Sequence, residues 1–98
     1  MRLYHNLIFI CFSLDIVIES YIGYWIQTSD NHELACGRSG VEGLECYLSQ
    51  GDGKADKYNY TIQGSTITRD DNFRKKGNYS GNGLISWLDG DSWVKQGR

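Results

Sequence analysis

Apolar and polar residues alternate with a period of two in several short stretches, and Gly-containing turns separate these stretches. The clearest case is residues 83–95, where two β-prone arms flank an Asp-Gly pair. A three-residue loop that ends with Gly90 in the left-handed conformation places Ile85 opposite Trp93. Trp87 then shares their face. We prefer this register to a two-residue loop, which would put the two tryptophans on opposite faces.

A second hairpin is predicted for residues 58–69. Gly64 occupies the first loop position, which suits a type II′ turn and pairs Ile62 with Ile67. In this register Tyr58, Tyr60 and both isoleucines face inward, whereas Asn59 faces solvent. The two hairpins together predict an antiparallel sheet.

The remaining stretches are less regular. Residues 21–27 and 43–48 alternate as strands do, and residues 28–43 are polar and predicted to be irregular. Residues 69–76 are charged and are predicted to form a turn followed by an edge strand, which lysine protects from pairing with other sheets. The fold class expected is all-β, a small antiparallel meander or partly open barrel of about five or six short strands.

The length and the N-terminus define the domain organisation. A chain of 98 residues allows one domain. Residues 1–20 have a short basic start and an apolar run at residues 7–14, which is too short to span a bilayer and is typical of a signal peptide. Cleavage is expected after Ser20, which leaves residues 21–98 as a single small β domain. The alternatives are a buried first strand or an uncleaved anchor.

The cysteines and the glycosylation motifs agree with secretion. Cys11 would leave with the signal peptide, and Cys36 and Cys46 would form a disulfide that stabilises the fold by roughly 2–3 kcal/mol. Asn59 and Asn78 each begin an Asn-x-Ser/Thr acceptor motif. The expected location is outside the cell or in the lumen of the secretory pathway.

Composition and motifs argue against several function classes. A net charge of −2 disfavours a dedicated nucleic-acid binder. Residues 32–36 approach a zinc-protease pattern, but Cys36 stands where the second histidine would be. Residues 51–56 lack the ligands of a calcium loop. We expect no metal, no cofactor and, because no nucleophile with a base and an orienting group is visible, no enzymatic activity.

Two resemblances follow from particular motifs. Residues 58–93, together with Trp25, resemble a small β module of otherwise uncharacterised eukaryotic proteins that ends in I-x-W-x-D-G-x-x-W. This resemblance implies a compact antiparallel sheet and no established activity. Residues 23–25 show the G-x-W spacing of the first lipocalin strand, which implies that Trp25 closes one end of a β structure. The chain is expected to be too short for a complete eight-stranded lipocalin barrel.

The function expected is that of a secreted module that binds a glycan or an extracellular protein through surface aromatic residues. The ligand-binding residues proposed are Trp93, Trp25 and Tyr79, with Trp87 buried and Trp93 partly exposed. The alternative is that all three tryptophans belong to the core. Two other functions stay open, a carrier of small apolar ligands and a structural subunit of a larger assembly.

A cluster of positive charge is the last candidate site. Arg74, Lys75 and Lys76 follow one another and would form a basic ligand patch. A solvated sheet edge is the preferred interpretation, because Asp70 and Asp71 offset their charge.

Overall fold

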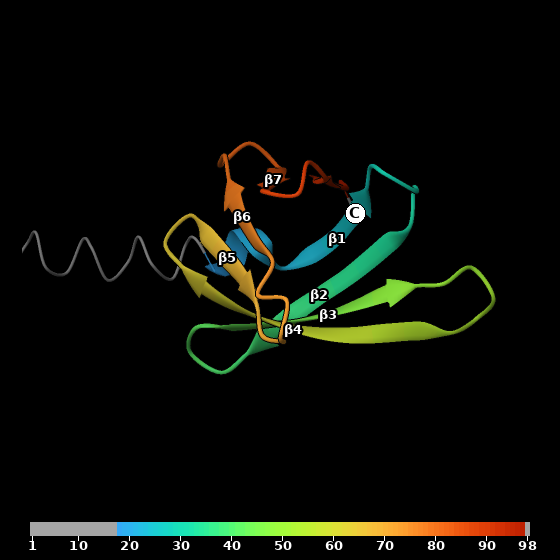
Figure 1. The fold of residues 1–98 in the computed structure, drawn as a ribbon, viewed down its shortest axis with the longest axis horizontal. Helices are drawn as coiled ribbons and strands as arrows, with labels where there is room; N and C mark the ends of the chain where they lie inside the picture. The colour runs from blue at the N-terminus through green and yellow to red at the C-terminus, as the bar shows by residue number, and fades with distance from the viewer. Residues whose placement is uncertain (1–17, 98) are drawn as a thin grey trace, which may run out of the picture.

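Eight antiparallel strands follow one another around a closed barrel, in which each strand pairs with the next and the last strand pairs with the first (Figure 1). The computed structural model describes residues 18–97. The strands are β1 (Gly23–Gln27), β2 (Glu33–Ser39), β3 (Gly43–Ser49), β4 (Ala55–Gln63), β5 (Thr66–Arg69), β6 (Lys76–Tyr79), β7 (Leu84–Trp87) and β8 (Ser92–Lys95). Most of the predicted signal peptide, including Cys11, lies outside the described residues.

The all-β antiparallel prediction is confirmed, but the sheet has eight strands and it closes. The strands can be this numerous in so short a chain because several of them have only four residues. The expected number of about five or six strands was therefore too low. The expected edge strand is also wrong, because β6 lies between β5 and β7 in the closed sheet.

Strand β2 lies within the stretch that was predicted to be irregular. Its inward positions, Leu34 and Cys36, are buried and lie opposite Leu48 and Cys46 of β3. Its polar residues face outward or continue the strand toward its exposed end at Arg38 and Ser39. The alternation is only two apolar residues long, which explains why the polar composition concealed it.

Both hairpins have the predicted registers. Ile85 lies opposite Trp93, and Ile62 lies opposite Ile67. Gly90 has a φ of 96°, and its backbone N–H donates to the carbonyl of Trp87 at 3.0 Å, which closes the three-residue loop. These local features fix which side chains enter the barrel.

Aromatic side chains fill the barrel. The ring centroids of Trp87 and Trp93 are 4.8 Å apart, and that of Tyr60 lies 5.5 Å from Trp93. The contacts are tilted or edge-to-face, as the quadrupoles of aromatic rings favour. The fully enclosed large side chains are Tyr21, Trp25, Leu34, Leu44, Cys46, Ile67, Ile85 and Trp93. The interior is thus a packed core.

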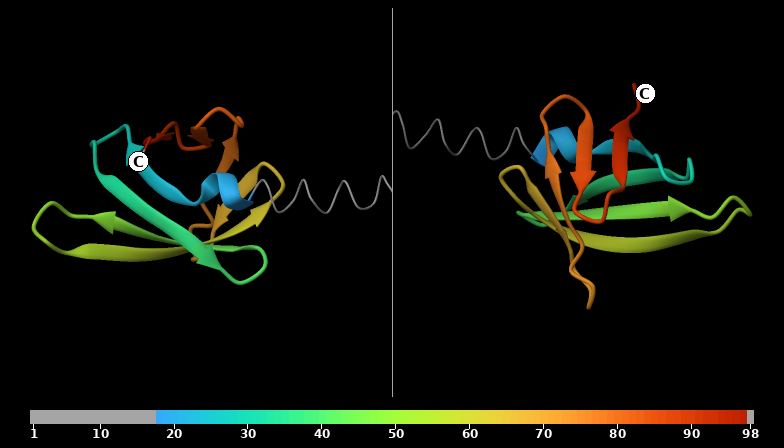
Figure 2. Two further views of the ribbon diagram at one scale, coloured as in Figure 1. Left: turned by 180° about the vertical axis from the view of Figure 1, so that it is seen from behind. Right: turned by 45° about the horizontal axis from the view of Figure 1, so that its top comes forward.

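A helical turn at residues 18–21 precedes β1 at one end of the barrel (Figure 2). Ile18 and Tyr21 are buried in the core. The ammonium group of Lys95 donates to the carbonyl of Ser20 at 2.6 Å, and the indole N–H of Trp25 donates to the carbonyl of Tyr21 at 2.9 Å. Burial lowers the pKa of Lys95. These contacts tie the turn to β1 and β8.

Within residues 18–97, no helix has the length and apolar character needed to cross a membrane.

Candidate functional site

The three aromatic residues proposed as a ligand site belong to the core. Trp25 and Trp93 expose 0% and 1% of their surface, and Tyr79 is half-buried against the same cluster. The partial exposure predicted for Trp93 is therefore wrong, whereas the burial predicted for Trp87 is confirmed. The physical reason is barrel closure, because β8 pairs with β1 and places Trp93 opposite Gln27 instead of at a free edge.

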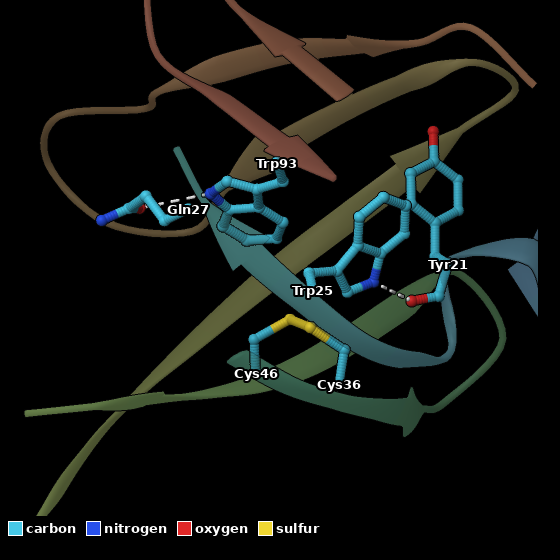
Figure 3. Close-up of a disulfide and its surroundings, with 6 residues drawn as sticks. All are labelled: Tyr21, Trp25, Gln27, Cys36, Cys46 and Trp93. Carbon is cyan, nitrogen blue, oxygen red and sulfur yellow. Dashed lines mark hydrogen bonds between the residues drawn. A yellow bond between two sulfur atoms is a disulfide. The ribbon is translucent and has the colours of Figure 1, made fainter. Parts of the chain in front are cut away.

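These residues do lie close together, but on the inside of the barrel. The ring centroid of Trp25 is 5.9 Å from that of Tyr79 and 6.3 Å from that of Trp93. Figure 3 shows the two indoles on the same side of the disulfide. The indole N–H of Trp93 donates a hydrogen bond to the side-chain oxygen of Gln27 at 3.2 Å. The alternative that all three tryptophans are core residues is correct for the folded barrel.

The predicted disulfide is present. Cys36 and Cys46 face each other across β2 and β3, and their Cα atoms are 4.1 Å apart. Asn59 and Asn78 are both exposed on the outer wall of the barrel, in β4 and β6. Exposure is what a glycan acceptor requires, and glycosylation itself stays a prediction.

The most exposed apolar side chains gather at two turns instead. Phe73, in the β5–β6 loop, and Leu88, in the β7–β8 turn, expose 82% and 83% of their surface. Both line a depression of about 490 Å³ on the outside of the barrel. We call this surface the turn patch, and its residues are Arg69, Phe73, Arg74, Lys75, Lys76, Leu88 and Asp89.

Local hydrogen bonds hold the two turns in place. The carboxylate of Asp71 accepts the backbone N–H groups of Phe73 at 3.1 Å and Arg74 at 3.2 Å, which fixes the tip of the β5–β6 loop. The backbone N–H of Leu88 donates to the carbonyl of Lys76 at 2.9 Å. This bond joins the β7–β8 turn to the start of β6, so segments distant in sequence form one surface.

Arg69 is held by neighbours on several sides. Its Nε lies 2.7 Å from a carboxylate oxygen of Asp71. Its guanidinium carbon lies 4.9 Å from the ring centroid of Tyr58 and 5.6 Å from that of Phe73, both within cation–π range. The charge of Arg69 is therefore compensated within the protein.

Lys75 is held in the same way. Its ammonium nitrogen lies 3.1 Å from a carboxylate oxygen of Asp89 and 3.9 Å from one of Asp91, and 4.9 Å from the ring centroid of Trp87. The backbone N–H of Asp91 and, to a lesser degree, the Lys75 ammonium hold the pKa of Asp89 below its usual range. Asp89 is thus ionised at neutral pH and compensates Lys75.

The other two cations of the turn patch differ from these. Arg74 and Lys76 are exposed, and neither makes an ion pair within residues 18–97. The turn patch therefore combines two compensated cations with two uncompensated ones and two exposed apolar side chains. Such a surface can attract an anionic group and at the same time bury apolar area.

The sequence indicated only half of this site. The run from Arg74 to Lys76 was recognised as a basic patch, but a solvated edge was preferred. The shared position of Phe73 and Leu88 at one depression was missed, because it arises only when β6 and β7 pair. A signal was present nonetheless, since each turn carries one large apolar residue among polar neighbours.

Within the part of the chain that the structure describes, His, Cys, Asp and Glu side chains do not gather into a group suited to a metal ion. Comparisons with protein-family models, with curated proteins and with solved structures find no significant match to this chain.

Proposed function

We propose that this chain is a non-enzymatic binding module of the secretory pathway or the extracellular space, and that it binds a protein partner through the turn patch. The observation that carries the proposal is the exposure of Phe73 and Leu88 beside a depression on the outer surface. The three tryptophans are buried in the core, whereas these two large apolar side chains are exposed to solvent. Such an arrangement favours a role in binding.

The geometry of the turn patch supports a protein partner. Aromatic and arginine side chains are enriched at the energetic centres of protein interfaces, and Phe73 and Arg74 supply one of each next to the depression. The depression has the volume of many ligand sites, which are about 300–1,000 Å³. The loop that carries Phe73 is also held by hydrogen bonds, so binding costs less conformational entropy.

The secretory location is supported by the disulfide between Cys36 and Cys46, because such bonds persist in oxidising compartments. The exposure of Asn59 and Asn78 adds to it. Mass spectrometry of the protein purified from its native source tests the location through the N-terminus, the disulfide and any glycans. Two free thiols and unmodified asparagines would contradict it.

The core lends no support to the alternative of an apolar-ligand carrier. Such a carrier needs room inside the barrel, whereas Trp25, Trp93 and their neighbours occupy that space. Tryptophan emission provides the test, because a fatty acid inside the barrel would alter the fluorescence of these residues. The proposed function predicts no response to fatty acids.

An array experiment tests the proposed function directly. Wild-type protein and the variants Phe73→Ser and Val41→Ser are applied to arrays of extracellular protein domains and of glycans. Val41 is a matched control, because it exposes 78% of its surface in the β2–β3 turn, away from the turn patch. We expect binding to a protein domain that Phe73→Ser abolishes and Val41→Ser preserves. Equal binding by the two variants, or binding to glycans alone, would contradict the proposal.

A further inference from the structure

We propose that the turn patch recognises an acidic segment of its partner protein, with an apolar side chain of that segment seated between Phe73 and Leu88. This inference rests on the proposed function and specifies the chemistry of the partner.

The charges of the turn patch favour an anionic partner. Asp71 already compensates Arg69, and Asp89 compensates Lys75. Arg74 and Lys76 are left without an ion pair among the described residues, so they are the groups with which carboxylates of a partner would pair. The overall charge of the protein is −2, so this local positive charge is opposite in sign to the whole. Local charge of this kind selects and orients a partner.

The backbone of Arg74 gives an independent reason to assign it a binding role. Its φ is 47°, in the left-handed region that arginine seldom adopts. Among residues 18–97, most other positions of this kind are glycines, such as Gly64 and Gly90. Strain of this kind costs on the order of 1–3 kcal/mol and occurs preferentially at functional sites. A turn that only reversed the chain would be easier to form with glycine than with Arg74.

The apolar part of the turn patch favours a peptide over a sulfated glycan. A sulfated glycan would gain most from a dense array of cations, whereas Asp71 and Asp89 lie among the cations here. Leu88 offers no aromatic face on which a sugar could stack, and with Phe73 it suits an aliphatic or aromatic side chain instead. A peptide that carries both an apolar residue and carboxylates satisfies the whole surface.

Selection from a peptide library tests this inference. A phage-displayed library of random twelve-residue peptides is selected on the immobilised, disulfide-bonded wild-type protein, and the enriched peptides are synthesised for titration. We expect a consensus of one large apolar residue flanked by Asp or Glu. Raising the salt from about 0.1 M to about 0.5 M should weaken binding about fivefold, because salt screens exposed charges. A neutral or basic consensus, or enrichment of no peptide, would overturn the inference.

A pair of charge reversals locates the contact. Lys76→Glu should weaken the binding of the acidic peptide at least about tenfold, whereas Lys54→Glu should change its affinity by less than about twofold. Lys54 is a matched control because it is exposed in the β3–β4 loop, outside the turn patch. A heparin-derived hexasaccharide serves as the competing ligand, and its tighter binding at the same patch would also overturn the inference.

The two proposals fail in different ways. If the selected peptides lose binding in Phe73→Ser but lack acidic residues, the turn patch is a binding site and only the partner chemistry is wrong. If acidic peptides bind equally well to Phe73→Ser, Lys76→Glu and the wild type, the site itself is wrong, and the proposed function fails with it.

Discussion

Trp93 and Gln27 lie opposite each other across the seam where β8 meets β1, and the indole N–H of Trp93 donates to the side-chain oxygen of Gln27 at 3.2 Å. This bond satisfies the polar atom of a side chain that is otherwise enclosed by apolar groups. It also explains why a tryptophan near the end of the chain belongs to the core. The seam removes the free edge at which the indole would have been exposed.

Gly77 is predicted to resist substitution, because core side chains of β7 pack directly against it. A Cβ atom at this position would lie 2.8 Å from Cε3 of Trp87 and 3.0 Å from Cγ2 of Ile85. Gly77→Ala should therefore lower the free energy of unfolding by about 1–3 kcal/mol through overpacking. Gly37→Ala, which meets nothing within 4 Å, should change it by less than about 0.5 kcal/mol. Chemical denaturation measures both, and equal effects would show that Trp87 does not pack on β6.

The helical turn at residues 18–21 is predicted to stabilise the barrel. A chain that begins at Tyr21 lacks Ile18, and burial of that side chain stabilises the fold by about 1.5–3 kcal/mol. It also lacks the carbonyl of Ser20, which accepts a hydrogen bond from the ammonium group of Lys95. It should melt at a lower temperature than a chain that begins at Ile18. The expected cleavage after Ser20 would have the same effect.

Lys95→Met provides the control for that comparison. A methionine at this position makes no hydrogen bond to the carbonyl of Ser20, so the loss of that carbonyl no longer matters. The difference in melting temperature between the two chains should therefore become smaller. If both chains melt at the same temperature with Lys95 present, the helical turn adds nothing to the fold.

The stability of the protein is predicted to fall at alkaline pH because of a buried tyrosine. Burial raises the pKa of Tyr60, with a smaller opposing effect from Arg69. The neutral phenol is thus favoured in the folded state, and its contribution is complete below the unfolded pKa of about 10. Above that pH the unfolded chain loses the proton while the folded barrel retains it, so the free energy of unfolding decreases as the pH rises.

Urea denaturation at pH 9 and pH 11 measures this decrease. Tyr60→Phe should reduce it, whereas Tyr47→Phe, at a residue that exposes 45% of its surface, should leave it unchanged. A decrease of the same size in Tyr60→Phe and the wild type would mean that Tyr60 is not responsible. Burial also raises the pKa of Tyr21, which is expected to account for part of the remaining decrease.

The sequence predicted the parts of this fold that depend on neighbouring residues. The Gly64 and Gly90 turns determine the registers of their hairpins, and the inward faces follow from those registers. The closure of the barrel was not predictable in this way, because it depends on the pairing of β1 with β8, two strands that are far apart in the sequence. The exposure of Trp93 was misjudged for the same reason. The turn patch was also missed as a unit, because Phe73 and Leu88 belong to different turns.

Arg74→Gly is the measurement that tests the central claim most directly. Glycine adopts the left-handed conformation of this position without strain, so the melting temperature should stay the same or rise, and the free energy of unfolding should stay the same or rise by up to about 2 kcal/mol. Binding to the partner domain or to the selected acidic peptide, titrated on the same sample, should weaken at least about tenfold. Unchanged affinity in a fully folded Arg74→Gly variant would contradict the assignment of the turn patch as the binding site.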